Sequence, residues 1–539
     1  MKTISAINNE RGMVLIVALM FLTLLSVLGA AGIMTSTMDM KIACANRSAA
    51  KALHIAEAGL TRAEAELIND LDTDQDIANA TFNATSGAID LTGLLSSTSF
   101  YTVFNAISFG EGSYTIEFKN YEPDPITQPG VYDPTTVWAR SIGTGPNSST
   151  VTLERYLSAE NLSPWNNAIF AGGGGAGQPL NGNIDIAGSI HVLGNGHIPT
   201  DIVVDSQTGQ FYNRNNLMDA TLANTIAGGT TTDLNAKFRI KTGRMQFGAA
   251  SGFIGEAACP FKGIYVQDGT DVAPADGTND DIINGSGKLH ADEGATSAEA
   301  YDLGDLSIPM PTIDTVYLNA NSLDLTGTTD VTGGPPNNDP NSATADGKPE
   351  KGLIAGALEL TVEYKPGGAT WYYPDIEQYD GASWAVSTNG IRFDSNTNVL
   401  EIKGIVKVTT LNISDDIKID GKGTIYTTGT TNIDGDILPN GNGTYPTTNC
   451  LGVVSTLDMT LPSSSQKLLT GAYFTAGQAV SSKQNELAGT IVCQGFNITN
   501  QVPKIWQVPS LANNLPPGMP GAAAIWVFTD RTWREITQE

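Results

Sequence analysis

The chain has 539 residues, with 56 Asp and Glu against 29 Lys and Arg, and a formal net charge of −27. A chain of this length exceeds a single hydrophobic core, so we expect several structural units. Phosphate binding needs clustered Lys and Arg, and so the acidic composition excludes nucleic acid as an expected partner. The cysteines are too few for a disulfide-built fold and too far apart for a CxxC zinc site, which leaves disulfide pairing among Cys259, Cys450 and Cys493 open.

The N-terminus predicts a membrane-spanning helix that is retained in the mature chain. A polar leader ends in Arg11-Gly12, and residues 13–38 carry no formal charge. About 20 apolar residues cross a bilayer as a helix, whereas a signal peptide has only ~7–15 before its cleavage site. The segment Gly29-Ala-Ala-Gly32 imitates such a site. Against that interpretation, the apolar run is too long and its helical character continues beyond Gly32.

The helix is expected to continue to about Asp70, because the first proline is Pro123. Apolar residues recur at spacings of four and three, which predicts a buried stripe. The predicted stripe comprises Ala49, Leu53, Ala56, Leu60, Ala63 and Leu67, and the predicted solvated side comprises Lys51, Arg62, Glu64 and Glu66.

The N-terminal residues described above resemble those of a known protein family. Arg11-Gly12 before Met13, the apolar half-helix, and His54-Ile-Ala-Glu-Ala-Gly-Leu60 are similar to the N-terminus of type IV pilins, and in particular of the PilX group of minor pilins. The resemblance implies that prepilin peptidase cuts after Gly12 and that Met13 becomes the methylated N-terminus. It also implies an inner-membrane assembly platform and other pilins as partners, which meet the N-terminal helix when the subunit leaves the membrane.

Three residues bear on assembly. Most pilins carry Glu as the fifth residue of the mature chain, where it neutralises a neighbour's terminal amine, whereas this chain has Val17. In that family, subunits without the carboxylate, such as the tip pseudopilin of type II secretion, are associated with filament initiation, so we expect a position at the tip. Gly29 and Gly32 each cost about 1 kcal/mol relative to alanine within a helix, which predicts a segment that loosens during assembly.

Alternating aspartates from Asp70 to Asp76 suggest a calcium site. A helix-loop-helix calcium loop needs Gly at its sixth position and Glu at its twelfth, and these positions hold Gln75 and Thr81. The pattern therefore favours a solvated turn after the helix, and bound calcium is left open.

Residues 100–160 predict a small antiparallel sheet. Tyr114, Ile116 and Phe118 alternate with polar neighbours, and two further strands flank the Gly-Pro-Asn-Ser turn at residues 145–148. A long helix followed by three or four antiparallel strands resembles the pilin head.

From about residue 161 the chain becomes rich in Gly and Asn, with short β-branched runs between turns. Stacked strands without intervening helices predict a β-solenoid, with a β-sandwich as the alternative. Large PilX-like proteins share this composition. Eight apolar positions are expected inside the strands: Ile402, Val406, Val408, Ile413, Ile417, Ile419, Ile425 and Ile433.

Two candidate small-ligand motifs are weak. Gly172, Gly174 and Gly177 match the spacing of a dinucleotide fingerprint, but Pro179 follows where a helix should begin. His191 and His197 lie near aspartates in the sequence, but without a spaced ligand set they are interpreted as exposed turn residues. We therefore expect no cofactor and no metal.

The enzymatic alternative is a β-helical polysaccharide-acting enzyme, displayed on a pilus or secreted. Thr431-Asn-Ile-Asp434-Gly-Asp436 and Arg239-Ile-Lys241 faintly resemble polygalacturonase motifs. Their order is reversed relative to that family, and its Gly-His-Gly motif is absent. Asp434 and Asp436 are therefore expected to make turn hydrogen bonds, and no catalytic residue is predicted.

We thus expect an α+β protein: a long N-terminal pilin-type helix with a small antiparallel β head, followed by a large all-β region that forms a β-helix or solenoid. The expected function is that of a non-catalytic minor pilin at or near a pilus tip, whose β-rich module contacts a surface ligand that the sequence does not identify; a type II secretion pseudopilin is a further alternative. The expected parts are a leader (1–12), a helix (13–70, with 13–33 in the membrane or filament core and 34–70 amphipathic), a β head (71–160), a surface module (161–510) and a C-terminal closing strand or tail (511–539).

Overall fold

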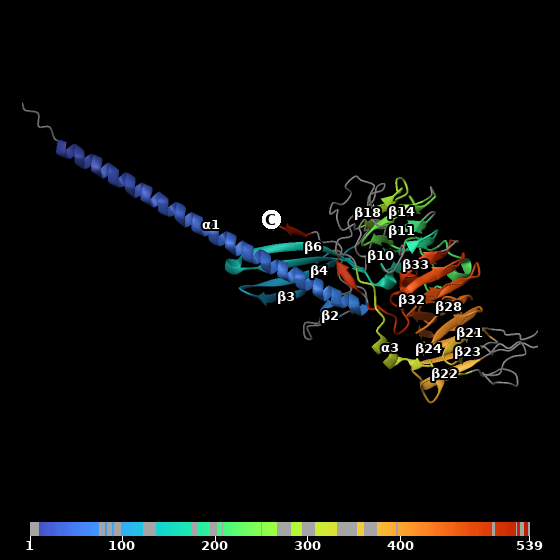
Figure 1. Ribbon diagram of the computed structural model, residues 1–539. Coiled ribbons are helices and arrows are strands. Elements are labelled where there is room, and N and C mark those ends of the chain that lie inside the picture. Colours follow the sequence, from blue (N-terminus) through green and yellow to red (C-terminus); the bar gives the residue numbers. More distant parts are fainter. Residues whose placement is uncertain are drawn as a thin grey trace, which may run out of the picture. The chain divides into compact units, whose positions relative to one another are not determined.

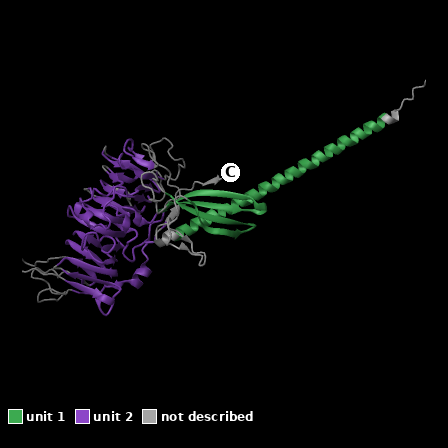
Figure 2. Ribbon diagram, turned by 180° about the vertical axis from the view of Figure 1, so that it is seen from behind, with its two compact units in different colours: residues 1–160, 526–539 green, residues 161–525 purple. Residues whose placement is uncertain are grey.

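The structure is a computed structural model with two compact units, residues 1–160 with 526–539 and residues 161–525 (Figure 2). The described residues are 10–74, 81–82, 89–90, 99–121, 136–173, 180–194, 202–206, 209–248, 251–266, 282–293, 308–330, 353–360, 375–394, 397–498, 502–523, 525–528 and 533–536.

The first unit begins with one uninterrupted helix, α1, which spans Glu10–Asp74 (Figure 1). It contains the whole predicted helix and extends beyond both predicted ends. The backbone of residues 70–74 forms the end of this helix, so the solvated turn predicted after Asp70 is wrong for those residues. Helical character persists there because neither Gly nor Pro interrupts the sequence. Asp76 lies outside the described residues.

The sheet of the first unit is antiparallel and follows chain order, as predicted for the head. Two strands from the C-terminus, β35 and β36, are neighbours of β6, so the predicted closing strand belongs to this sheet. The strands are β3 (Tyr101–Phe109), β4 (Gly112–Asn120), β5 (Thr136–Thr144), β6 (Thr150–Asn161), β35 (Trp526–Phe528) and β36 (Trp533–Ile536), with a separate antiparallel pair, β1 (Thr81–Phe82) and β2 (Ile89–Asp90).

The second half of α1 packs on this sheet. The predicted alternation in β4 is confirmed, because Tyr114, Ile116 and Phe118 are all buried. Ala56, Leu60, Ala63 and Leu67 are buried against them in one core, and Leu53 packs at its edge. Ala49 is exposed, contrary to the prediction. The buried stripe starts at Ser48 and Ala52, because the helix face turns toward the sheet slightly earlier than the apolar pattern indicated.

Two glycines let the helix and the sheet approach closely. A Cβ at Gly143 of β5 would lie 2.3 Å from the carbonyl oxygen of Ala52 and 2.6 Å from the amide nitrogen of Ala56. A Cβ at Gly59 would lie 2.2 Å from Oγ of Ser141. Gly59 is the glycine of the pilin-like Ala-Glu-Ala-Gly-Leu motif, and this contact gives the physical reason for a residue without a side chain there.

The second unit is a single 28-stranded sheet in which most pairings are parallel. Over much of the unit, three consecutive short strands form one winding, called a layer below, and most strands pair with the strand three places later. In the N-terminal half the three series are β7 (Ile169–Ala171), β10 (Ile190–Val192), β13 (Lys237–Ile240), β16 (Phe261–Val266) and β18 (Ala291–Glu293); β8 (Leu180–Asn181), β11 (Ile202–Ser206), β14 (Arg244–Phe247) and β17 (Ile282–Ile283); and β9 (Asp185–Ala187), β12 (Gln210–Tyr212) and β15 (Phe253–Ile254).

The C-terminal half repeats this pattern with longer strands. Near its start it also contains antiparallel pairs between β20 and β21 and among β22, β23 and β24. Its strands are β19 (Leu323–Asp324), β20 (Leu353–Ile354), β21 (Ala357–Leu360), β22 (Ile376–Tyr379), β23 (Gly390–Asp394), β24 (Val399–Val408), β25 (Thr410–Ile413), β26 (Ile417–Asp420), β27 (Lys422–Thr427), β28 (Thr431–Ile433), β29 (Ile437–Pro439), β30 (Cys450–Ser455), β31 (Met459–Thr460), β32 (Leu468–Ser481), β33 (Glu486–Ile498) and β34 (Lys504–Trp506), and the short helices of this unit are α2 (Ala220–Thr225) and α3 (Thr315–Asn321).

The last layer of this unit stacks on its first. β33 pairs with β7 and β8, and β34 pairs with β9, all in parallel. The N–H of Leu162 also donates to the carbonyl of Ile525, so the chain enters and leaves the unit side by side. We call the junction of β33 and β34 with β7, β8 and β9 the seam. The chain thus starts in the middle of the stack and returns to the middle.

The interior of the stack is apolar, and all eight positions predicted between residues 402 and 433 are buried. Buried amides stabilise the turns between strands, a feature the sequence analysis did not identify. Oδ1 of Asn485, for example, accepts from the N–H of Lys467, and its Nδ2 donates to the carbonyl of Pro462. The residues in this role are Asn213, Asn389, Asn449, Asn485 and Gln507.

The coarse fold prediction is confirmed: a long N-terminal helix, a small antiparallel sheet and a large β-rich region.

Candidate functional site

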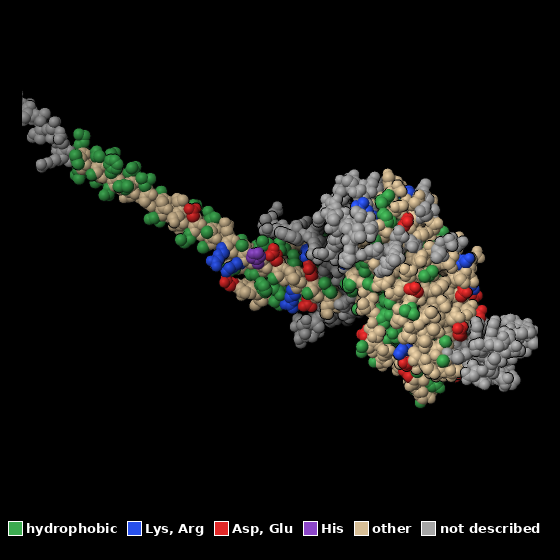
Figure 3. All heavy atoms as spheres, in the orientation of Figure 1, with side chains coloured by type: hydrophobic (Ala, Val, Ile, Leu, Met, Phe, Trp, Pro, Cys, Tyr) green, Lys and Arg blue, Asp and Glu red, His purple; other side chains and the backbone are tan. Residues whose placement is uncertain are grey.

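The first half of α1 is apolar on every side and uncovered by the rest of the chain. From Met13 to Ile42 its large apolar side chains are all exposed, and Met34 reaches 73%. Figure 3 shows hydrophobic side chains around this part of the helix. The described part of the chain contains one helix that is long and apolar enough to cross a membrane, and this is it. Such a surface is stable only in lipid or against other apolar helices.

Four hydroxyl groups on this half-helix have partners within the helix itself. Thr23 donates to the carbonyl of Met20, and Ser26 donates to that of Leu22. Thr35 and Thr37 each bond to the carbonyl four residues earlier. These side chains therefore bring no unpaired donor into an apolar surrounding, which suits both lipid and a helical bundle.

The predicted processing and assembly residues lie on this half-helix. Gly12 and Met13 fall within the helical backbone, and residues 1–9 lie outside the described residues. Val17 is 47% exposed, on the apolar surface. A Cβ at Gly29 or Gly32 would meet nothing within 4 Å in this chain, so the chain itself gives no packing reason for either glycine.

The charged residues of the second half are not simply solvated, contrary to the prediction. Lys51 forms an ion pair with Glu111 in the β3–β4 turn, and this ammonium lowers the pKa of the Glu111 carboxyl. Glu64 forms an ion pair with Arg155 of β6. These partners lie far away in the sequence, and so the helical pattern alone could not reveal that the charges dock the helix on the sheet.

Arg62 joins the same contact between helix and sheet. Its Nη1 donates to the hydroxyl of Tyr114 at 3.2 Å, and its guanidinium lies 4.1 Å from the ring centroid of Phe104. Its Nε is also 3.5 Å from the carboxylate of Glu66. The first unit therefore combines a docked amphipathic half-helix with a free apolar one.

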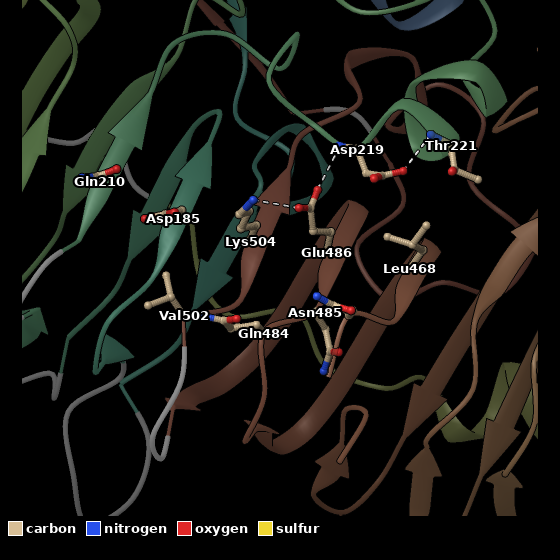
Figure 4. Close-up of a pocket in the computed structure, with 11 residues that line it drawn as sticks. Asp185, Gln210, Asp219, Thr221, Leu468, Gln484, Asn485, Glu486, Val502 and Lys504 are labelled. Atoms are coloured by element: carbon tan, nitrogen blue, oxygen red, sulfur yellow. Dashed lines mark hydrogen bonds and ion pairs between the residues drawn. The ribbon is translucent and has the colours of Figure 1, made fainter. Parts of the chain in front are cut away.

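The second unit has a polar cleft at the seam, with a volume of about 770 Å³ (Figure 4). A row of side chains at one register position, called the seam column below, lies along the cleft. Each member is the Cα partner of the next across neighbouring strands. The seam column is Leu468, Glu486, Lys504, Asp185 and Gln210, and the other residues lining the cleft are Asp219, Thr221, Gln466, Gln484, Asn485 and Val502.

The carboxylate of Glu486 accepts from three donors. Lys504 Nζ is 2.8 Å from Oε1, while Trp506 Nε1 and the backbone N–H of Asp219 donate to Oε2 at 3.1 and 3.0 Å. Asp219 is in turn the N-cap of α2, where its carboxylate accepts from the N–H of Thr221. The carboxylate of Glu486 therefore joins the two halves of the stack and α2 at the seam.

Asp185 has a different environment from Glu486. The pKa of Asp185 is raised to about 6, mainly by burial; the charge of Lys504 opposes this rise, and the charge of Glu486 adds to it. No described side chain donates a hydrogen bond to its carboxylate. At Gln210, the next residue of the seam column, the side-chain oxygen accepts from the hydroxyl of Tyr212 at 2.5 Å. The cleft therefore offers an acceptor at Asp185 and amide donors at Gln210.

The polysaccharidase-like residues have structural partners. Asp434 accepts from the backbone N–H groups of Ser463 and Ser464, and Asp436 accepts from that of Leu468. These donors lie 29 to 32 residues further along the chain, so the bonds are not the local turn bonds that were predicted. Arg239 is a buried residue of β13 whose guanidinium lies 5.8 Å from the ring centroid of Tyr265.

The interpretation of His191 as an exposed turn residue is wrong. It is 1% exposed in β10, and its ring lies 5.0 Å from that of Phe170 in the neighbouring strand. The strand is only three residues long and is bounded by glycines, which gave its sequence the pattern of a turn. His197, Gly174 and Gly177 lie outside the described residues. Among the residues that the structure describes, no group of three or more His, Cys, Asp or Glu could hold a metal ion.

All four cysteines are free thiols. Register shows why Cys450 and Cys493 are not paired: Gly452, Ala472 and Thr490 are Cα partners across β30, β32 and β33. Cys450 precedes this row by two residues and Cys493 follows it by three, so they lie about 16 Å apart along the strands. A disulfide needs Cα atoms within about 7 Å.

Comparison with known proteins agrees with this architecture. Residues 11–61 match the family described as PilX N-terminal. No curated protein sequence matches the chain. Among solved structures, the crystal structure of the competence-associated pilin ComZ from Thermus thermophilus is similar, with a TM-score of 0.54 and 19% sequence identity over 91% of this chain and 98% of that one. At this identity the likeness shows the fold alone.

The first unit thus combines a docked amphipathic half-helix, a free apolar half-helix and an antiparallel sheet, and the fold of the chain is similar to that of a pilin. Residues 11–61 match the PilX N-terminal family, so the resemblance recognised in the sequence is confirmed for this segment.

Proposed function

We propose that the chain is a non-catalytic minor pilin that prepilin peptidase cuts after Gly12. Residues 13–33 anchor it in the inner membrane, and the assembly platform then moves it into a filament. There the second unit is displayed for surface adhesion or pilus initiation. The observation that carries the proposal is α1 itself, whose first half is apolar all round and exposed while its second half packs on a sheet of the same chain.

We further propose that the second unit is a β-solenoid. Support comes from the parallel pairing of most strands with the strand three places later and from an interior lined by stacked apolar residues. In this interpretation the outward-facing side chains of successive layers form continuous rows, and these are available to a ligand.

The proposed place of the subunit is at or near the filament tip. A terminal amine buried without a carboxylate partner costs several kcal/mol, so a subunit docked above this one would lack the partner that Glu provides in most pilins. The chain can still dock on a subunit below that carries the Glu, which then pairs with the terminal amine at Met13. A unit of residues 161–525 on every subunit would also crowd a helical lattice.

The test is mass spectrometry of sheared filaments. The proposal expects this chain in the filament fraction at a low ratio to the major pilin, with an N-terminal peptide that begins at a methylated Met13. Replacing Gly12 by a bulky residue should leave an uncut, membrane-retained precursor. A mature N-terminus near Gly32, or absence of the chain from filaments, contradicts the proposal.

One observation favours a second candidate function, a displayed polysaccharide-acting enzyme. Glycosidases need one protonated and one ionised carboxyl group on either side of the bond they cleave. Asp185 has a raised pKa, Glu486 is paired with Lys504, and the two carboxyl groups lie two strands apart in the seam column. Release of reducing ends from a glycan by the purified chain, and its loss in Glu486→Gln, would favour this candidate.

A further inference from the structure

The seam column combines opposite charges and amides at a regular spacing. Its five members occupy successive strands, which lie about 4.8 Å apart in a sheet. A ligand that lies along the cleft therefore meets a new side chain at nearly constant intervals. This periodicity suits an extended polymer whose repeating unit is of similar length, as a sugar unit is.

The chemistry of the cleft suits hydroxyl groups. Its lining contains three carboxylates, four side-chain amides, one ammonium group and two aliphatic side chains. Amides and carboxylates both bond to sugar hydroxyls, which donate and accept at once. The cleft volume of about 770 Å³ also lies within the usual ~300–1,000 Å³ of ligand sites.

The charge of the cleft selects among glycans. Asp185, Asp219 and Glu486 face the single cation Lys504, which is already paired with Glu486. An acidic sugar would bring a further negative charge beside Asp185 and be repelled, whereas a hydroxyl or an amino group would find an acceptor there.

We propose that the seam cleft binds a glycan chain without acidic groups, neutral or amino-bearing, which lies across the layers along the seam column. This proposal rests on the proposed function, because the cleft gives the displayed second unit its ligand. The two halves of the stack both contribute, Glu486 and Lys504 from the last layers and Asp185 and Gln210 from the first, so the site is complete only when the seam is closed.

The experiment measures binding of the full chain, purified in detergent, to a panel of neutral, amino-bearing and uronic-acid oligosaccharides. We expect binding of neutral or amino-bearing members and none of the uronic acids. Asp185→Asn and the exposed Gln484→Ala should each weaken binding at least tenfold. Lys418→Ala and Asp420→Asn, exposed changes on β26 away from the cleft, should leave binding unchanged.

Thermal unfolding of each variant at or above the wild-type temperature shows that the fold is intact. Failure of every glycan to bind, preferential binding of uronic acids, or equal effects of the cleft and β26 variants would each overturn the inference.

The proposed pilin function is tested separately. Filaments from cells that carry Asp185→Asn or Gln484→Ala should contain the chain at the wild-type ratio while they lose glycan binding. If the chain binds glycans but is absent from filaments, the proposed pilin function is wrong and the glycan site at the seam cleft is supported. If the bound glycan is cleaved, the glycan site at the seam cleft is supported and the non-catalytic assignment is wrong.

Discussion

Replacing Gly143 by alanine tests how closely α1 must pack on its sheet. The added Cβ would lie 2.3 Å from the carbonyl oxygen of Ala52, 2.6 Å from the nitrogen of Ala56 and 2.9 Å from the Cβ of Ala56. Two of these three contacts are helix backbone, which no side-chain rotation relieves. The helix must therefore move away from β5.

The magnitude follows from two opposing terms. Overpacking of a buried site costs typically 1–3 kcal/mol, and backbone clashes place Gly143→Ala near the upper end. Alanine recovers about 0.5–1 kcal/mol, because glycine loses more conformational freedom on folding. The net destabilisation of the first unit is about 2 kcal/mol. The state in which the helix has separated from the sheet therefore becomes about 30-fold more populated.

Hydrogen exchange of the full chain in detergent, resolved by peptide, measures this effect. We expect about 30-fold faster exchange in residues 48–67 and in β4 and β5, with the second unit unchanged. Gly327→Ala is the matched control, since a Cβ there meets nothing within 4 Å. Exchange in residues 48–67 at the wild-type rate would refute the inferred packing.

Three further outcomes are expected. Asn485→Ala leaves the buried carbonyl of Pro462 and the partly buried N–H of Lys467 without this partner, and an unpaired buried group costs about 1–3 kcal/mol. Thermal unfolding of the second unit should therefore occur at a clearly lower temperature, while the exposed Asn432→Ala should not change it. The pKa of Asp185 is raised from 3.8 to about 6 in the folded state, so the folded state binds this proton more tightly than the unfolded state. The resulting contribution to the free energy of unfolding is fully present below about pH 4 and is lost as the pH rises through about 6. Urea unfolding should show this fall in stability, and Asp185→Asn should remove it. Replacing both Gly29 and Gly32 by alanine should slow hydrogen exchange of that segment in assembled filaments, and unchanged exchange would count against a loosened segment.

Local periodicity predicted the parts of the fold that are set by neighbouring residues. The alternation of Tyr114, Ile116 and Phe118 predicted a strand with one buried face, and apolar spacing predicted most of the helix stripe. The position of Ala49 was missed because the sheet, and not the helix pattern, decides where the stripe begins.

The seam could not be predicted, because it joins residues more than 300 positions apart in the sequence. Lys504 and Asp185 become Cα partners only when the last layer stacks on the first. Nor does the sequence distinguish the buried turn amide Asn485 from an ordinary loop asparagine, since burial depends on the neighbouring layer. His191 was misassigned for a similar reason, because its three-residue strand is recognisable only from its parallel partners.

The location of the second unit on intact filaments tests the pilin function most directly. Gold-labelled antibodies against residues 161–525 can be imaged on filaments by electron microscopy. An assembled subunit with Val17 and a large displayed unit predicts one or very few labels per filament, at one end. Labels spaced along the whole shaft, or confined to the membrane fraction without filaments, would contradict it.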